Sequence, residues 1–279
     1  MVQQVTDSAS YLTSWPVSGL STSTVYYARV RHKGATYGYS GWSNAIAFTT
    51  MSKPTMPSIT APANGATGLN TTVNFSSTSF SMGSGSDSHA ASDWQLSTDS
   101  SFNNIISQVS GDTSHLTTWS VSGLAIGTSF YVRVRHKGSV SGYSDWSNGS
   151  TFRTMTKPNA PSIVSPSNGA TSVPIATTIT SSAFSQSNGS ESHASSTWQV
   201  ATDAGFSNVV AHTENDSNNK TAFNVSGLSY NTTYYVRVAY QGSVSGYSDW
   251  SSTSSFTTKI PPPPNAPSIT SPVSGASLV

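Results

Sequence analysis

Apolar and polar residues alternate along short stretches of this chain, which is the pattern of β-strands with one buried face. In residues 128–138, TSFYVRVRHKG, a period of two separates an inward face from an outward face. We expect Tyr131, Arg133 and Arg135 to point outward. The inward set, which we expect in a core, is Thr128, Phe130, Val132 and Val134.

Similar runs follow one another with only Gly, Ser, Asn and Asp between them, and no stretch has the 3.6-residue spacing of a helix. Seven short strands in about 100 residues are typical of an antiparallel β-sandwich, so the sequence predicts an all-β fold. The other strands are expected within residues 71–80, 92–98, 104–110, 116–124 and 149–154, with a Pro-rich entry strand before them.

The whole pattern recurs every 104 residues. The pair Gly19-Leu20 returns at 123–124 and at 227–228, and Trp42 returns as Trp146 and Trp250. A period of this length is the size of a small domain rather than of a solenoid unit. We therefore predict the C-terminal part of one sandwich, two complete sandwiches, and a Pro-rich linker with the first strand of a further repeat, at residues 1–52, 53–156, 157–260 and 261–279.

Neither end of the chain falls at a repeat boundary. By the same step Met1 corresponds to Ile105, and Val279 corresponds to Val173 once the two extra residues of the third linker are allowed for. A half-sandwich exposes its core. We expect the chain to be an excerpt of a longer repeat array, with its first sandwich completed by missing sequence; completion by another chain is the alternative.

Proline-rich linkers stand between the repeats, at residues 52–58, 156–162 and 259–268. Proline fixes φ and biases the preceding residue toward extended geometry, so short linkers of this kind are fairly stiff. The sequence therefore predicts a rod-like arrangement of beads.

Composition narrows the class of partner. Only 8% of residues are charged and the formal net charge is +1, so the chain lacks the basic field that nucleic-acid binding needs. With no cysteine, neither disulfides nor thiolate metal sites can form. No run of about 20 apolar residues exists, so we expect no membrane insertion.

The second and third repeats carry a run of motifs that resembles the second half of a fibronectin type III domain. The run is Gly-Leu, Thr-x-Tyr/Phe-x-Val-Arg-Val, Ser-x-Trp-Ser, Phe-x-Thr and then a proline linker, and Trp94 and Trp198 fit the expected third strand. The resemblance implies tandem seven-stranded, immunoglobulin-like sandwiches. The sequence of residues 193–210, HASSTWQVATDAGFSNVV, also resembles repeats of bacteriophage tail and fibre proteins and of some marine bacterial surface proteins.

The Ser-x-Trp-Ser segments resemble the tryptophan and arginine ladder of cytokine-receptor fibronectin domains. That resemblance implies guanidinium groups stacked on indole rings, a structural role that is favoured over a ligand surface. The third repeat departs from the pattern because Ala239 stands where the second repeat has Arg135. The predicted stacking residues are Arg29, Arg31, Trp42, Arg133, Arg135, Trp146, Arg237 and Trp250.

Titratable residues have structural interpretations. His89 and His193 each follow a carboxylate by two residues, which is too few ligands for a metal and favours a bracing hydrogen bond. Asp99 and Asp203 are predicted to accept backbone N–H groups in turns, with the phenylalanine three residues later returning to the core. No catalytic motif is present, so we expect a non-enzymatic protein with no cofactor and no metal.

The leading hypothesis is a structural spacer in a homo-oligomeric assembly, most consistent with a bacteriophage tail, fibre or other virion appendage that presents or supports adhesion elements. The alternative is a carbohydrate or cell-surface binding module of a bacterial adhesin or secreted hydrolase. This alternative is based on loop tyrosines, which could stack on sugar rings and so bind glycans weakly. Either hypothesis places the protein in a virion or at the cell surface. The tyrosines are Tyr39, Tyr143 and Tyr247.

Overall fold

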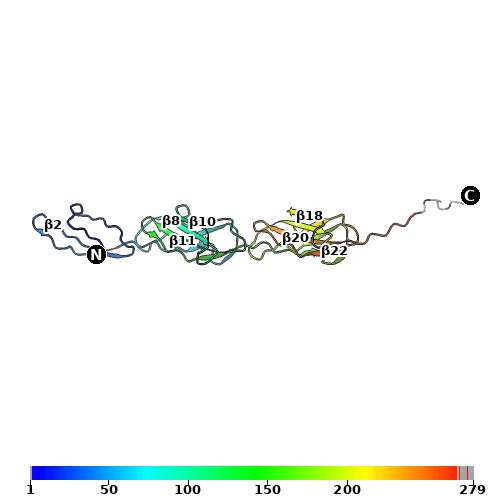
Figure 1. Cartoon of the computed structure of the whole chain (residues 1–279), viewed down its shortest axis with the longest axis horizontal. Helices are drawn as coiled ribbons and strands as arrows, with labels where there is room; N and C mark the ends of the chain where they lie inside the picture. The colour runs from blue at the N-terminus through cyan, green and yellow to red at the C-terminus, as the bar shows by residue number, and fades with distance from the viewer. Residues whose placement is uncertain (1, 269, 271–274, 276–279) are drawn as a thin grey trace. The chain divides into compact units, whose positions relative to one another are not determined.

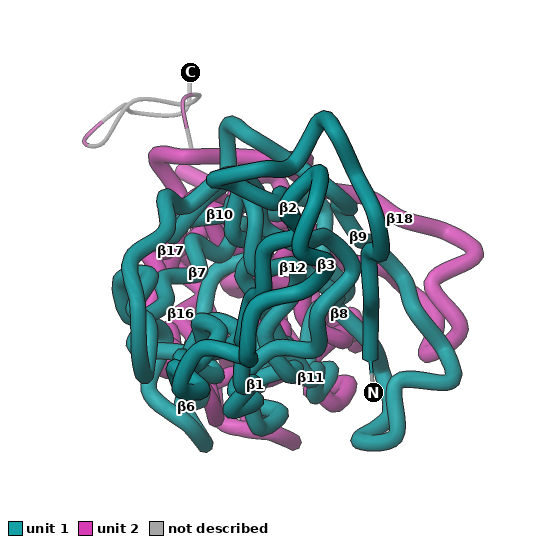
Figure 2. Tube along the Cα trace, turned by 90° about the vertical axis from the view of Figure 1, so that its left-hand side faces the viewer, with its two compact units in different colours: residues 1–155 teal, residues 156–279 magenta. Residues whose placement is uncertain are grey.

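A computed structural model describes residues 2–268, 270 and 275 of the chain, and its secondary structure there consists of β-strands and turns (Figure 1). The chain divides into two compact units, residues 1–155 and 156–279, coloured separately in Figure 2. No helix in the described part is long and apolar enough to cross a membrane. The entry strand predicted within 261–279 lies mostly outside the described residues.

The first unit contains one complete two-sheet sandwich, here called the second sandwich. Its smaller sheet has the order β10-β7-β5, and its larger sheet has the order β6-β13-β11-β8-β9 with β12 paired to β11. Neighbours are antiparallel except β6 and β13, which are parallel. The strands are β5 (Ile59–Ala61), β6 (Ala66–Leu69), β7 (Val73–Ser77), β8 (His89–Ser97), β9 (Ile105–Asp112), β10 (Thr118–Val121), β11 (Ser129–Gly138), β12 (Gly142–Tyr143) and β13 (Ser150–Thr154).

The second unit repeats this arrangement in the third sandwich. Its sheets have the orders β14-β16-β19 and β15-β22-β20-β17-β18, with β21 paired to β20. Its strands are β14 (Ile163–Ser165), β15 (Ala170–Val173), β16 (Thr177–Ser181), β17 (His193–Ala201), β18 (Val209–Asp216), β19 (Ala222–Val225), β20 (Thr233–Gly242), β21 (Gly246–Tyr247) and β22 (Ser254–Thr258).

Residues 2–52 form only the last hairpins of a sandwich. Strand β1 (Val25–Ala28) pairs with β4 (Ile46–Thr49), and β2 (Lys33–Gly34) pairs with β3 (Gly38–Tyr39). No opposing three-stranded sheet covers this segment among the described residues. Phe48 is therefore 42% exposed, whereas the equivalent Phe152 of the second sandwich is 2% exposed.

The predicted inward face of residues 128–138 is confirmed. Phe130, Val132 and Val134 are buried and belong to one core cluster with Trp94 and Phe152. The indole N–H of Trp94 donates to the carbonyl of His115 at 2.8 Å, so the largest core ring keeps its polar group satisfied. The third sandwich has the same core around Trp198, whose indole donates to Asn219 at 2.7 Å.

Two details of the strands differ from the sequence-based expectation. The entry strand is split: β5 joins the smaller sheet and β6 joins the larger one, because the chain crosses between the sheets at residues 62–65. Strand β8 begins at His89 rather than near residue 92, since its backbone pairs with β11 from Gly138 onward. The extension brings residues 89–91 into the sheet.

Candidate functional site

The outer face of the larger sheet of the second sandwich carries an alternating stack of cations and aromatic rings. The guanidinium of Arg133 lies 4.2 Å from the ring centre of Phe102 and 4.6 Å from that of Trp146. The guanidinium of Arg135 lies 4.6 Å from the ring centre of Trp146 and 4.2 Å from that of Tyr143. The ammonium group of Lys137 is 5.2 Å from Tyr143. We call this set of side chains the cation–aromatic stack.

Neighbouring strand β8 fixes the two guanidinium groups of the stack. Asp93, only 2% exposed, accepts from Arg135 through Nη2 at 2.7 Å and through Nε at 2.8 Å. The amide oxygen of Gln95 accepts from Nε of Arg133 at 2.8 Å. Burial and the adjacent Arg135 lower the pKa of Arg133, but a guanidinium stays protonated at neutral pH. Each cation is thus held by an acceptor in its plane and by rings on its faces.

The first repeat holds the same stack in the residues it contains. Arg29 lies 4.5 Å from the ring of Trp42, and Arg31 lies 4.7 Å from Trp42 and 4.0 Å from Tyr39. Lys33 follows at 5.2 Å from Tyr39. The Tyr39 hydroxyl donates to the carboxylate of Asp7, and this hydrogen bond raises the pKa of Tyr39.

The third sandwich has an incomplete stack. Arg237 lies between Phe206 and Trp250, at 4.1 Å and 4.4 Å from their ring centres. The next position on the strand is Ala239, so no guanidinium from this strand enters between Trp250 and Tyr247. The hydroxyl of Tyr247 donates to the side-chain carbonyl of Asn215.

The structure thus places all eight predicted arginine and tryptophan residues in stacks, and it also brings in residues that the sequence reasoning assigned elsewhere. Phe102 and Phe206 were expected in the core, and both are buried, each 9% exposed. They lie against the guanidinium groups on the outer face and outside both core clusters. The loop tyrosines Tyr39 and Tyr143 also belong to the stacks.

The turn at Asp99 explains where Phe102 goes. The carboxylate accepts the backbone N–H groups of Ser101, Asn103 and Asn104, and these hydrogen bonds lower the pKa of Asp99. Phe102 adopts a φ of 58° in this turn, and its buried ring packs against the guanidinium of Arg133. The expected turn role of the aspartate is therefore confirmed.

The histidines lie at one end of the second sandwich. The rings of His89 and His136 are 4.4 Å apart, and Phe80 stacks on His89 at 5.0 Å. His89 Nε2 and Ser92 Oγ are 2.9 Å apart, as expected for a bracing hydrogen bond. Burial, with a contribution from His89, lowers the pKa of His136 to about 4. Within the described residues, no three His, Cys, Asp or Glu side chains gather as a metal site would require.

A carboxylate fixes the loops next to the stack. Asp87, in the loop before β8, accepts from the backbone N–H of Val140 at 3.1 Å and of Ser141 at 2.8 Å, and also from the hydroxyls of both Ser139 and Ser141. These hydrogen bonds strongly lower the pKa of Asp87. Glu191 makes the equivalent contacts to Val244 and Ser245 in the third sandwich.

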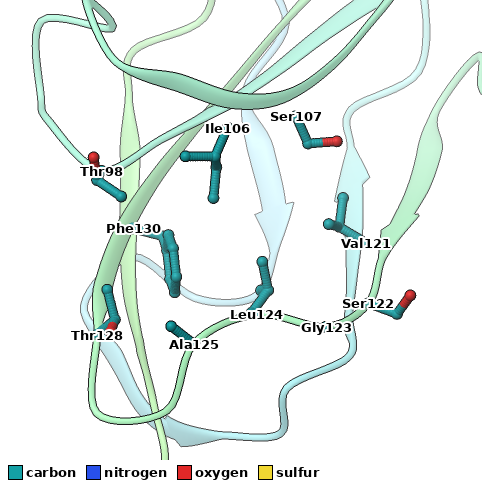
Figure 3. Close-up of a pocket in the computed structure, with 10 residues that line it drawn as sticks. All are labelled: Thr98, Ile106, Ser107, Val121, Ser122, Gly123, Leu124, Ala125, Thr128 and Phe130. Atoms are coloured by element: carbon teal, nitrogen blue, oxygen red, sulfur yellow. The ribbon is translucent and has the colours of Figure 1, made fainter.

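The best-formed hollow of the second sandwich, about 380 Å³, offers little chemistry. Figure 3 shows the side chains of Ile106, Leu124 and Phe130 facing a common space between strands of the sandwich. Its remaining lining residues are small or hydroxyl-bearing, and none is titratable. The hollow therefore has neither a general base nor a charged group that would orient a substrate.

The strand order defines the class of protein. A three-stranded sheet facing a larger mixed sheet, with long central strands β8 and β11, is the immunoglobulin-like sandwich arrangement, and each complete repeat is fibronectin type III-like. No family profile matches the chain, and no curated protein matches it.

Two solved structures illustrate the likeness. One contains the fibronectin(III)-like modules of Clostridium thermocellum CbhA, with 14% identity over 74% of this chain and 95% of that chain and a TM-score of 0.30. The other contains the FN1–FN3 domains of chicken CNTN1, with 15% identity over 85% of this chain and 78% of that chain and a TM-score of 0.29.

Proposed function

We propose that this chain is a non-enzymatic spacer segment of an extended repeat protein, which sets the reach of an assembly and supports adhesion elements. The observation that carries the proposal is the way each linker is fixed to the sandwich that follows it. Lys53 contacts Asp145 at 2.5 Å, and Lys157 contacts Asp249 at 2.7 Å. Backbone bridges join Pro54 to Met82 and Pro158 to Gln186.

Backbone hydrogen bonds add to these attachments. The hydroxyl of Ser52 accepts from the N–H groups of Gly83 and Ser84 at 3.1 and 3.0 Å, while its own N–H donates to the carbonyl of Ser84 at 3.2 Å. Exposed ion pairs contribute little alone, about 0 to 1 kcal/mol each. Several contacts on a proline-fixed segment act together, so each linker follows its sandwich instead of swinging freely.

The stacks support a mechanical role because their faces are already occupied from within the chain. Arg135 and Lys137 cover Tyr143, and Arg31 and Lys33 cover Tyr39. A tyrosine engaged on its face by a cation has less surface for a sugar ring. The carbohydrate-binding alternative therefore fits the first two repeats less well than the spacer does.

We further propose that the assembly is homo-oligomeric and forms part of a bacteriophage virion appendage. The resemblance of residues 193–210 to repeats of phage tail and fibre proteins supports this proposal. The apolar surface around Phe48 is covered in that assembly by further sequence or by another chain. Immunogold labelling with antibodies against residues 53–260 tests this proposal. Gold along tails or fibres of purified particles supports it, whereas gold confined to bacterial envelopes contradicts it.

A further inference from the structure

The dipeptide Asn-Gly occurs four times in this chain, at residues 64–65, 148–149, 168–169 and 188–189. Asparagine is among the chemically least durable residues in proteins. A glycine after it has no Cβ to hinder the approach of its backbone nitrogen to the asparagine side chain. When that nitrogen attacks the side-chain amide carbon, a five-membered imide forms. The four dipeptides are therefore the places where the chain is able to modify itself.

Two of the four dipeptides are held by the last strand of their sandwich. Gly65 donates its N–H to the carbonyl of Thr151 at 2.7 Å, and the side-chain oxygen of Asn64 accepts the N–H of Thr151 at 2.9 Å. The dipeptide 168–169 holds Ser255 in the same way, at 2.8 and 2.9 Å. The glycine nitrogen must give up its hydrogen bond before it attacks, so this pairing protects both dipeptides.

The dipeptide 148–149 has no such protection. Asn148 and Gly149 are both exposed and stand directly before β13. Within the described residues, neither the Gly149 N–H nor the Asn148 side chain has a hydrogen-bond partner. The contacts that β13 makes along this edge begin at Thr151, which leaves Gly149 outside them. Both reacting groups are thus free and open to water.

We propose that Asn148 is a site of spontaneous modification, where the chain converts its own asparagine into aspartate and isoaspartate. The Gly149 nitrogen forms a bond to Cγ of Asn148, the Cγ–Nδ2 bond breaks, and ammonia leaves with the proton that the glycine nitrogen gives up. Water then opens the imide at either of its two carbonyls, which yields the two acids. The reaction needs only water, and the proposal does not rest on the spacer function.

The position lies between two anchors of the second sandwich. The N–H of Ser147 donates to the carbonyl of Val134 at 2.8 Å, and Ser150 begins β13 beside β11. A Cβ atom added at Gly149 would lie 3.2 Å from the ring of Phe102, so the backbone already packs closely against the cation–aromatic stack. Isoaspartate adds one methylene to the main chain and one negative charge within this short span. We expect it to loosen residues 147–150.

The other two repeats provide comparisons at the same place. The first repeat has Asn44 followed by Ala45, and the third has Ser252 followed by Thr253. The Cβ of alanine hinders ring closure, and serine has no amide to lose. Asn44 should therefore react more slowly than Asn148, and Ser252 should not react.

The test incubates the full chain at mildly alkaline pH and follows each asparagine separately by mass spectrometry of proteolytic peptides, with aspartate and isoaspartate forms separated by chromatography. We expect Asn148 to react at least about fivefold faster than Asn64 and Asn168, since one hydrogen bond of ordinary strength corresponds to a factor of that size. In denaturant the three rates should converge, because the dipeptide is the same and the hydrogen bonds are gone.

Variants of the second and third sandwiches provide matched controls. Ser252→Asn with Thr253→Gly should create a new fast site, because Ser251 is anchored to Val238 at 2.8 Å as Ser147 is to Val134. Asn148→Asp carries the charge without the added methylene. Hydrogen exchange at residues 147–150 should therefore be faster in isoaspartate-containing chains than in Asn148→Asp.

The proposal is overturned if Asn148 reacts no faster than Asn64 and Asn168 in the folded chain, or if the same difference persists in denaturant. A transplanted dipeptide at 252–253 that reacts as slowly as the two protected ones would also contradict it. Unchanged hydrogen exchange in the isoaspartate-containing chains would overturn the expected loosening of residues 147–150.

Discussion

His136 and Tyr240 occupy equivalent positions near the ends of β11 and β20, and they meet the same surroundings with different chemistry. His136 is fully buried, with Nε2 at 3.2 Å from Ser77 Oγ, while its Nδ1 has no hydrogen-bond partner. Tyr240 is also fully buried, and its hydroxyl bonds to Ser181 at 2.6 Å and to the carbonyl of Ser182. The tyrosine satisfies its polar atom without any group that titrates near neutral pH.

Acid should therefore destabilise the second sandwich through His136. Its pKa is about 4 when folded and about 6.5 when unfolded, so the folded state favours the neutral ring. This contribution is fully present above about pH 6.5 and is lost as the pH falls toward about 4. We predict that lowering the pH from about 7.5 to 4.5 costs about 2 kcal/mol through this residue, and that His136→Tyr removes that loss.

Denaturant unfolding of the second sandwich, followed at both pH values, measures this difference. The comparison between wild type and variant keeps the other titrating groups constant, including His89, whose pKa burial also lowers. Equal losses of stability in the two proteins would show that His136 does not carry the acid response.

A tyrosine hydroxyl closes the loop before β20. Tyr234 Oη accepts the backbone N–H of Ser229 at 2.9 Å, and Tyr26 does the same for Ser21, but the second sandwich has Phe130 at this position. We predict that Tyr234→Phe costs the third sandwich about 1 kcal/mol of unfolding free energy. Phe130→Tyr should stabilise the second sandwich by a similar amount. Thermal unfolding checks both, and a gain from Tyr234→Phe would contradict the account.

At the scale of strands, β8 and β11 show how an ion pair is built into a sheet face. Asp93 is nearly inaccessible to solvent and is paired to Arg135, whereas the third sandwich has Thr197 and Ala239 at these places. A carboxylate left buried without its arginine must bear its desolvation cost alone. Each sandwich therefore avoids an unpaired buried charge only because both residues of its pair, Asp93 with Arg135 or Thr197 with Ala239, occur together.

We therefore predict strong coupling between these two positions. Arg135→Ala alone should destabilise the second sandwich by about 2 kcal/mol or more, because Asp93 loses its charged partner. The double variant Asp93→Thr with Arg135→Ala should cost less than the single variant. A double-mutant cycle from denaturant unfolding measures the coupling, and simple additivity of the two single effects would contradict it.

The loop hairpin after β11 depends on a contact with the loop before β8. Asp87 holds the N–H groups of Val140 and Ser141, and a Cβ atom added at Gly138 would lie 2.2 Å from the Asp87 carboxylate. We predict that Asp87→Ala and Gly138→Ala both speed hydrogen exchange at residues 139–142. Glu191→Ala should do the same at residues 243–246 only. Unchanged exchange in all three variants would show that the carboxylates do not fix these loops.

The sequence allowed the strands and the core to be predicted where alternation is strong, as in β11, because period two directly separates the faces of a strand. It could not predict the position of Phe102. That residue lies in a turn, where its direction depends on a left-handed backbone and on a guanidinium from another strand. The ladder was expected from the resemblance, but the inclusion of Tyr39 and Tyr143 depends on the pairing of the hairpins.

At the scale of the whole molecule, the account rests on repetition. The two complete sandwiches share the same arrangement of core, arginine–aromatic stacking and fixed linker. A chemical site usually occurs once on a scaffold, whereas a length-setting element benefits from each copy. The repeated features therefore favour a mechanical role.

Small-angle X-ray scattering of the chain in solution tests the spacer proposal most directly. A compact domain of 279 residues would have a radius of gyration of about 19 Å. We predict a radius of gyration well above this value and a pair-distance distribution with the long tail of an extended particle. In the unmutated chain, which contains Lys53 and Lys157, raising the salt concentration should change both quantities little. A radius near 19 Å, or a broad flexible-chain profile, would contradict the claim that the linkers hold the sandwiches as a spacer.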